Sequence, residues 1–349
     1  MAKEKILITG GTGYIGSHTV VELFNAGYEP IIIDNLSNSN IGVLDGIKAI
    51  TGHTVIYENI DCKDYNSLER FLEKHPEIVA IAHFAASKSV SESVENPLLY
   101  YRNNIVSLLN LLQLMPKFNI KNIVFSSSCT VYGQPDKLPV TEESPIKPAT
   151  SPYGSTKQMC ETILQDYGFA NKDINIILLR YFNPIGAHPS GEIGELPNGV
   201  PNNLLPYITQ TAAGIRKELS VFGDDYNTPD GSCIRDYINV VDLAKAHVIA
   251  LNRVIEGKNK KNIEVFNLGT GSGVSVLEII NSFEKATGVK LPYKIVGRRS
   301  GDIEKVWADT SFANKELGWK ATESLEDTLR SAWNWQQKLE EKNLTNTNG

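Results

Sequence analysis

Near its N-terminus the chain reads Lys5-Ile6-Leu7-Ile8-Thr9-Gly10-Gly11-Thr12-Gly13-Tyr14-Ile15-Gly16, and this stretch determines the architecture. The apolar run predicts a buried strand, and the residues from Tyr14 onward predict a helix. Because glycine lacks a Cβ atom, Gly10 permits a tight turn, Gly13 lets backbone amides approach a pyrophosphate, and Gly16 lets the helix pack closely on the strand. The helix N-terminus then presents unpaired N–H groups to that anion.

The first half of the chain alternates between strand-like and helix-like segments. Short runs rich in Ile, Val and Leu predict strands that are buried on both faces of a parallel sheet, with crossover helices between them. The predicted strands are 5–9, 30–34, 54–58, 78–84, 122–126 and 175–181, and the predicted helices are 14–26, 66–74, 97–115 and 152–170. The sequence therefore predicts an α/β fold with a Rossmann-type doubly wound parallel sheet.

The second half differs in composition, because Gly and Pro cluster in 184–206 and 223–231. Loop-rich sequence attached to an α/β sheet is where a substrate site is usually built. The predicted elements here are helices at 202–217, 240–254, 276–287 and 325–339 and one strand at 265–268. We expect residues 1–182 to form a nucleotide-binding domain and 183–341 mainly a smaller C-terminal substrate-binding domain, with some segments returning to the sheet. The polar residues 342–349 are expected to be a disordered tail.

The composition is that of an ordinary globular protein. The 349 residues are 41% hydrophobic and 21% charged, and 34 Lys and Arg against 40 Asp and Glu give a formal net charge of −6. This acidic balance argues against nucleic acid as the main partner. No apolar run approaches the roughly 20 residues of a membrane span, and the N-terminus lacks a signal-peptide pattern. Four scattered cysteines (Cys62, Cys129, Cys160 and Cys233) and the absence of metal-ligand spacing predict free thiols, no metal and a cytoplasmic location.

Asp34 ends the second predicted strand, 18 residues after Gly16. A carboxylate in this position can accept hydrogen bonds from an adenosine ribose and repel the 2′-phosphate of NADP. Together with the glycines it predicts NAD binding. The alternative is that Asp34 simply belongs to a solvated turn at 34–38.

A second constellation follows the fifth predicted strand. Tyr153 and Lys157 share one face of a helix that Ser151 and Pro152 begin. A tyrosine titrates near about 10, so its use as a base requires neighbouring positive charge. About one Tyr-x-x-x-Lys pair is expected by chance in a chain of this length. Its place beside Ser126-Ser127-Ser128, at the carboxyl end of a strand, favours a catalytic role with Ser128 or Thr130 orienting a substrate hydroxyl.

These motifs resemble the extended short-chain dehydrogenase/reductase family, and within it the UDP-glucose 4-epimerase family. The resemblance runs from about Ile6 to Trp335. It is carried by His83-Phe84-Ala85-Ala86-Ser87-Lys88-Ser89-Val90, Ser126-Ser127-Ser128-Cys129-Thr130-Val131-Tyr132-Gly133, Arg180-Tyr181-Phe182-Asn183-Pro184-Ile185-Gly186-Ala187-His188-Pro189, Pro201-Asn202-Asn203-Leu204, Arg235-Asp236-Tyr237 and Arg298-Arg299-Ser300-Gly301-Asp302. Ala86 and Cys129 depart from the glycine and alanine that are common in the family, and both are small enough to change local packing only.

The resemblance implies an isomerase of galactose metabolism that reversibly epimerises UDP-glucose and UDP-galactose at C4, with NAD as cofactor and a 4-keto intermediate. It also implies a homodimer that packs through 97–115 and 152–170. The implied catalytic residues are Tyr153, Lys157 and Ser128. The residues implied to line NAD are Gly10, Gly13, Tyr14, Ile15, Gly16, Asp34, Asn35, Asp61, Cys62, Phe84, Ala85, Lys88, Asn103, Ser126, Tyr153, Lys157 and Tyr181. Those implied to hold the UDP-sugar are Ser128, Tyr153, Asn183, Asn203, Leu204, Phe222, Arg235, Arg299, Asp302 and Val306.

The resemblance places Val306 beside the 2-position of the hexose, where a tyrosine would restrict the enzyme to glucose and galactose. A smaller side chain leaves room for an N-acetyl group, so UDP-GlcNAc and UDP-GalNAc are expected substrates too, although Val306 could instead simply pack in a strand. Two other functions remain as alternatives. A nucleotide-sugar 4,6-dehydratase would need an Asp-Glu pair where this chain has Cys129 and Thr130. A non-catalytic sensor of NAD or nucleotide sugars would have lost Tyr153 or Lys157, and both are present.

Overall fold

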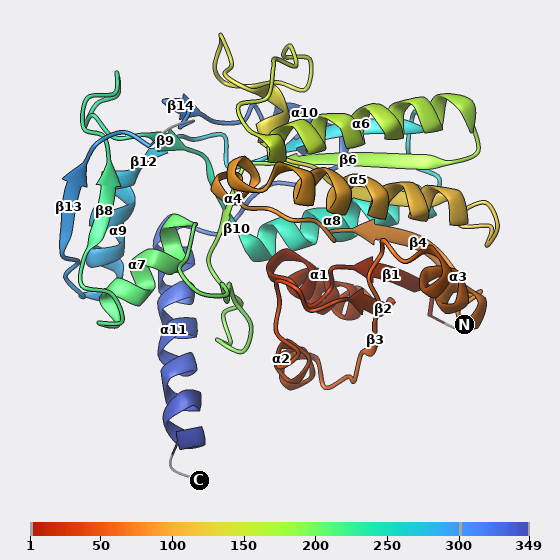
Figure 1. The fold of residues 1–349 in the computed structure, drawn as a ribbon, viewed down its shortest axis with the longest axis horizontal. Coiled ribbons are helices and arrows are strands. Elements are labelled where there is room, and N and C mark those ends of the chain that lie inside the picture. Colours follow the sequence, from red (N-terminus) through yellow and green to blue (C-terminus); the bar gives the residue numbers. More distant parts are fainter. Residues whose placement is uncertain (1–2, 300–301, 348–349) are drawn as a thin grey trace.

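A seven-stranded parallel sheet forms the larger body of the molecule (Figure 1). The structure is a computed structural model that describes residues 3–299 and 302–347. The strands in spatial order are β11 (Ile263–Leu268), β6 (Asn175–Tyr181), β5 (Asn122–Ser126), β4 (Ile78–His83), β1 (Lys5–Thr9), β2 (Glu29–Asp34) and β3 (Ile56–Asn59). The chain winds outward from β1 to β3 and then crosses back to β4. The predicted doubly wound sheet is confirmed, and a ligand crevice is expected where β1 and β4 end.

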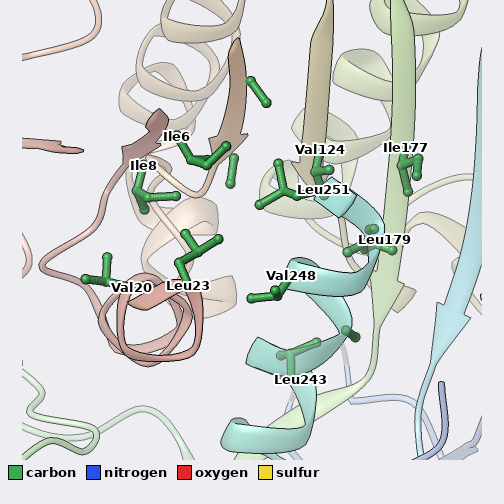
Figure 2. Close-up of a cluster of buried hydrophobic side chains, with 14 of the residues drawn as sticks. Ile6, Ile8, Val20, Leu23, Val124, Ile177, Leu179, Leu243, Val248 and Leu251 are labelled. Atoms are coloured by element: carbon green, nitrogen blue, oxygen red, sulfur yellow. The ribbon is translucent and has the colours of Figure 1, made fainter. Parts of the chain in front are cut away.

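Helices cover both faces of this sheet, because side chains along each strand point alternately to opposite sides. Ile6 and Ile8 pack against α1 (Tyr14–Asn25), α2 (Val43–Thr51) and α8 (Val240–Ile255), and Leu7 points to the opposite face. Figure 2 shows the first of these clusters, with side chains from the sheet, α1 and α8 directed toward one another. The opposite face is covered by α3 (Tyr65–Lys74), α5 (Pro97–Leu114) and α6 (Pro152–Ala170).

Most of the chain after residue 182 builds a smaller body beside the sheet (Figure 1). Its strands pair as β7 with β10, β8 with β13, and β12-β9-β14. The bounds of these strands are β7 (Asn183–Ile185), β8 (Leu219–Phe222), β9 (Ile234–Arg235), β10 (Tyr237–Asn239), β12 (Val274–Ser275), β13 (Tyr293–Val296) and β14 (Lys305–Val306). The remaining helices are α4 (Val90–Glu95), a 3₁₀ turn (Cys129–Tyr132), α7 (Leu204–Ala212), α9 (Val276–Thr287), α10 (Ser311–Glu316) and α11 (Leu325–Thr347). The chain returns to the large sheet through α8 and β11.

Two predicted boundaries in this half are wrong. Helix α7 ends at Ala212 and not at Lys217, because Gly214 adopts the left-handed conformation, with φ of 75°. Helix α11 continues to Thr347, so most of the predicted disordered tail is helical, whereas residues 348 and 349 lie outside the described residues. Among the described residues, no helix is long and apolar enough to cross a membrane.

Candidate functional site

The glycine-rich loop builds the floor of a first cavity at the carboxyl ends of β1 and β4. Gly10 has a φ of 71°, and a Cβ atom there would lie 2.7 Å from the backbone nitrogen of Ala85. A Cβ atom on Gly16 would lie 2.3 Å from the carbonyl oxygen of Gly10, so both positions require glycine. Gly13 precedes α1, which has neither a side-chain cap nor an acidic residue in its first turn. The N-terminus of α1 is therefore open to an anion such as a pyrophosphate.

Asp34 is a structured carboxylate and not merely part of a solvated turn. It is buried, and its Oδ2 accepts a hydrogen bond from the Thr12 amide at 3.2 Å. Its Oδ1 accepts from the Leu36 amide at 2.9 Å and from the Ser39 hydroxyl at 3.1 Å. These bonds fix the end of β2 to the glycine-rich loop. The same carboxylate lines the first cavity, where its negative charge would disfavour the extra phosphate of NADP.

Every residue that the sequence associates with NAD lines this first cavity, from the glycines to Tyr181. The segments arrive from β1, β2, β4, β5 and β6 and from α5 and α6, so sequence-distant residues meet at one edge of the sheet. Further lining residues were missed by sequence reasoning, and each lies within four residues of a predicted one in the chain. They are Ile33, Ser37, Asn38, Ser39, Ile60, Ala86, Ser87 and Ser107.

The Tyr153–Lys157 pair stands at one end of the first cavity. Ser151 caps α6 by accepting a hydrogen bond from the Gly154 amide at 3.2 Å, which fixes the helix start just before Tyr153. The Lys157 Nζ atom donates to the carbonyl oxygen of Ser126 at 2.7 Å and lies 5.9 Å from the centroid of the Tyr153 ring. The Ser128 side chain hydrogen-bonds the Tyr153 side chain. The structure thus brings together the three predicted catalytic residues.

Burial governs the protonation of this pair. It raises the pKa of Tyr153 well above its ordinary value, and the hydrogen bond with Ser128 opposes that shift. Burial lowers the pKa of Lys157 to about 8, while the nearby Cys160 and Glu161 side chains act to raise it. In the protein alone the phenol is therefore neutral. Positive charge beside the ring is needed for Tyr153 to act as a base.

A second cavity, of about 430 Å³, lies in the smaller body. Arg299 makes a two-pronged hydrogen bond to Asp302, at 3.2 Å from Nε and 2.8 Å from the terminal nitrogen, and Arg235 lies 3.8 Å from the same carboxylate. Two guanidinium groups share one carboxylate, so a net positive charge remains for a diphosphate. The predicted substrate residues that line this cavity are Asn183, Asn203, Leu204, Phe222, Arg235, Arg299 and Asp302. Its lining also includes Glu195, a residue that no sequence motif singled out.

The remaining predicted substrate residues lie elsewhere. Tyr153 lines the first cavity, and Ser128 begins the 3₁₀ turn beside it. Val306 is 4% exposed and packs in a hydrophobic cluster with Val131 and Phe182. On the neighbouring strand β9, Arg235 is its partner in the parallel pairing with β14. Its expected place beside the hexose thus stays a prediction.

The cysteines lie apart from one another in the described part of the structure and form no disulfide. All four cysteines are free thiols. Burial raises the pKa of Cys129, next to Ser128, to about 12, so its thiol stays protonated at neutral pH. Within residues 3–299 and 302–347, no group of His, Cys, Asp and Glu side chains is arranged to hold a metal ion.

The fold and the two cavities define a dinucleotide-binding protein of the extended short-chain dehydrogenase/reductase class. Residues 7–332 match a family model described as GDP-mannose 4,6 dehydratase. The chain is 51% identical to UDP-glucose 4-epimerase of Dictyostelium discoideum, over 95% of this chain and 96% of that one. It is 48% identical to UDP-glucose 4-epimerase of Homo sapiens, over 96% and 97% of the two chains. It therefore belongs to the UDP-glucose 4-epimerase family, within the broader family that the dehydratase model describes.

Solved structures agree with this assignment. The crystal structure of UDP-glucose 4-epimerase from Bifidobacterium longum in complex with NAD+ and UDP superposes with a TM-score of 0.91 at 50% identity, covering 96% of this chain and 98% of that one. The enzyme from Stenotrophomonas maltophila, with bound NAD and formylated UDP-arabinopyranose, gives a TM-score of 0.93 at 46% identity, covering 97% and 99%.

Proposed function

We propose that the protein is an NAD-dependent epimerase that interconverts UDP-glucose and UDP-galactose by inverting C4 of the hexose through a 4-keto intermediate. The observation that carries the proposal is the Tyr153–Lys157 pair in a cavity whose glycine-rich floor fits a dinucleotide. The second cavity, with Arg235 and Arg299, supplies the cationic groups that a nucleoside diphosphate requires. The relatives of similar length and about half-identical sequence have this activity.

The residues of the first cavity fit NAD. The open N-terminus of α1 suits the pyrophosphate, and Asp34 suits an unphosphorylated adenosine ribose. When bound, NAD supplies an oxidised nicotinamide that takes a hydride from C4 and later returns it to the opposite face. The cofactor thus ends each cycle in its starting oxidation state, which predicts that the enzyme retains it.

The protein's own residues move the proton. The Tyr153 oxygen, as phenolate, accepts the proton of the C4 hydroxyl and later gives it back to the 4-keto oxygen. The Lys157 ammonium, held by the Ser126 carbonyl, favours the phenolate, and Ser128 hydrogen-bonds at the same oxygen. Arg235 and Arg299 hold the diphosphate while the 4-keto hexose rotates to present its other face between the two hydride transfers.

The runner-up activity, a 4,6-dehydratase, needs an acid–base pair to eliminate water. Cys129 and Thr130 stand at those positions, and a protonated thiol with a pKa of about 12 beside a hydroxyl cannot perform that work. A non-catalytic sensor is disfavoured because Tyr153 and Lys157 both line the first cavity and Ser128 hydrogen-bonds Tyr153.

The direct test is to incubate the purified protein with UDP-galactose and no added cofactor and to follow the formation of UDP-glucose. We expect conversion, with NAD released when the protein is denatured. If the folded, NAD-containing protein leaves UDP-galactose unchanged, the epimerase proposal is wrong.

The same proposal extends to the homodimer. Helices α5 and α6 pack side by side on one face of the sheet, and they expose Leu98 (80%), Leu109 (39%) and Met159 (45%) to solvent. A two-fold axis beside these helices would bury the exposed side chains in an isologous interface. Free cysteines throughout the chain fit a reducing, cytoplasmic location.

Sedimentation of the wild-type protein should give the mass of two chains, and Leu109→Glu should shift it toward one chain because a buried, unpaired charge is costly. Ile215→Glu, an equivalent change at an exposed position just after α7, is the matched control and should leave the dimer intact. A wild-type monomer would contradict this part of the proposal.

A further inference from the structure

A carboxylate on the loop before α7 contacts residues of both cavities. The Glu195 Oε1 atom accepts hydrogen bonds from Lys88 Nζ at 3.1 Å and from Asn203 Nδ2 at 2.6 Å. Lys88 lines the first cavity, and Asn203 and Glu195 line the second. Because the Glu195 side chain is only 10% exposed, losing its bonds costs more than losing those of an ordinary surface pair.

The backbone of Glu195 is fixed from the other side by α11. The Trp335 indole N–H donates to the carbonyl oxygen of Glu195 at 3.0 Å. The loop also approaches this ring so closely that a Cβ atom on Gly194 would lie 2.5 Å from it. The carboxylate of Glu195 is therefore held in place by contacts on both sides.

Asn203 occupies the N-cap position of α7, where asparagine is among the most favoured capping residues. Its side chain nevertheless makes no capping hydrogen bond, and its amide nitrogen is bound by Glu195 instead. The first-turn residues Leu204 and Leu205 line the second cavity. The amide groups at the start of α7 thus remain available to an anionic ligand, beside Arg235 and Arg299.

We propose that Glu195 is a positioning residue for the UDP-sugar. It holds the side-chain amide of Asn203 away from the backbone N–H groups of the first turn of α7, so that these N–H groups can bind the diphosphate. Lys88 offsets the negative charge that Glu195 brings into the site. This inference rests on the proposed function, since it needs a nucleoside diphosphate as the ligand of the second cavity.

The test uses the NAD-containing enzyme and UDP itself as the probe. In Glu195→Ala, Asn203 is free to cap α7, so the Kd for UDP measured by calorimetry and the KM for UDP-galactose should both rise about tenfold. The kcat should stay within about twofold, because the side-chain partners of Glu195 are Lys88 and Asn203 and not the catalytic Tyr153 or Lys157. Glu195→Gln keeps an acceptor for Asn203 and should hold the Kd within about threefold of wild type.

Two further comparisons separate positioning from general damage. Glu192→Ala removes a carboxylate from the same loop, one that pairs with Lys338 and Lys342, and should leave the Kd for UDP unchanged. In an Asn203→Ala background, Glu195→Ala should add little, because the effect passes through Asn203. Glu195→Met fills the same space without an acceptor and tests the same expectation if Glu195→Ala does not fold.

A Kd for UDP within twofold of wild type in Glu195→Ala or Glu195→Met would overturn the inference, as would an undiminished effect in the Asn203→Ala background. These results differ from a failure of the proposed function, in which the wild-type protein itself would neither bind UDP nor convert UDP-galactose.

Discussion

At the scale of single residues, the site has to make a buried phenol lose its proton. Burial raises the pKa of Tyr153, so the positive charge of Lys157 is essential for stabilising the phenolate. Burial also disfavours the protonated form of Lys157, lowering its pKa to about 8. Glu161 acts against this second effect from one helical turn away and is itself held by Arg180 at 2.6 Å. Glu161, held in place by Arg180, thus supports the protonated state of Lys157.

Replacing Tyr153 by phenylalanine removes the proton acceptor and keeps the ring. We expect kcat for UDP-galactose to fall by about 10²–10⁴-fold, the range for loss of a general acid–base group. The amount of NAD released on denaturation should not change, since the ring still closes the end of the first cavity. Turnover close to that of wild type would mean that another residue is the base.

Val306 is the residue from which we expect broad substrate use. The wild-type enzyme should also interconvert UDP-GlcNAc and UDP-GalNAc, and Val306→Tyr should abolish this while sparing UDP-galactose, because added bulk repels the N-acetyl group. Val306 is buried beside Val131 and Phe182, so tyrosine also costs about 1–3 kcal/mol of overpacking. Comparing kcat/KM for both substrate pairs in the two proteins tests the expectation, with Val306→Ala as the control that keeps both activities. Wild-type inactivity toward the N-acetylated pair would reject it.

At the scale of elements, the segment from β1 to α1 is predictable because each local signal agrees with the next. An apolar strand, glycines at turn positions and a helix start follow one another within 5–16. The strands β7, β9, β10, β12 and β14 could not be predicted, because each has only two or three residues and no periodicity to detect. Glu195 was missed for a similar reason, since its role depends on partners far away in the sequence.

Asp34 joins two elements, so its loss should have two consequences. Asp34→Ala removes the bonds to the Thr12 amide and the Ser39 hydroxyl, loosening the glycine-rich loop, and also removes the charge that opposes NADP. We expect weaker NAD retention together with measurable NADP binding, both followed by dialysis and cofactor titration. Asp64→Ala is the matched control: it removes the cap of α3 without touching the cavity and should preserve the NAD preference. Unchanged NADP rejection by Asp34→Ala would show that the carboxylate only shapes the turn.

At the scale of the whole molecule, the chain folds back on itself. Helix α8 and strand β11 come from the second half and complete the core of the first. Figure 2 shows the α8 side chains in this core. This return explains why residue 182 is not a clean boundary between the two bodies. It also buries His247 of α8 against Phe84 and Tyr181, at ring distances of 4.7 and 6.2 Å.

The buried histidines predict a loss of stability in mild acid. Burial lowers the pKa of His18 and His83 to about 3 and that of His247 to about 4. Below about pH 6.5 these imidazoles become protonated in the unfolded chain but stay neutral in the folded protein. The free energy of unfolding therefore falls as the pH falls. At pH 5, about 1.5 pH units below the unfolded value, each histidine costs about 2 kcal/mol. Glu22, Glu142 and Asp236, whose pKa values are raised by burial, act in the opposite direction and reduce the total.

Urea unfolding between pH 7.5 and 5 measures this effect above the range in which most carboxylates titrate. We expect the free energy of unfolding of the wild-type protein to fall by several kcal/mol. That of His247→Phe should fall by about 2 kcal/mol less over the same interval, because phenylalanine removes one imidazole that is protonated only in the unfolded chain. The substitution suits the site, since His247 already packs against aromatic rings and its Nε2 atom is buried without a hydrogen-bond partner. Comparing each protein with itself at the two pH values cancels any packing cost of the phenylalanine. An equal loss in both proteins would show that His247 does not contribute to the acid sensitivity of the fold.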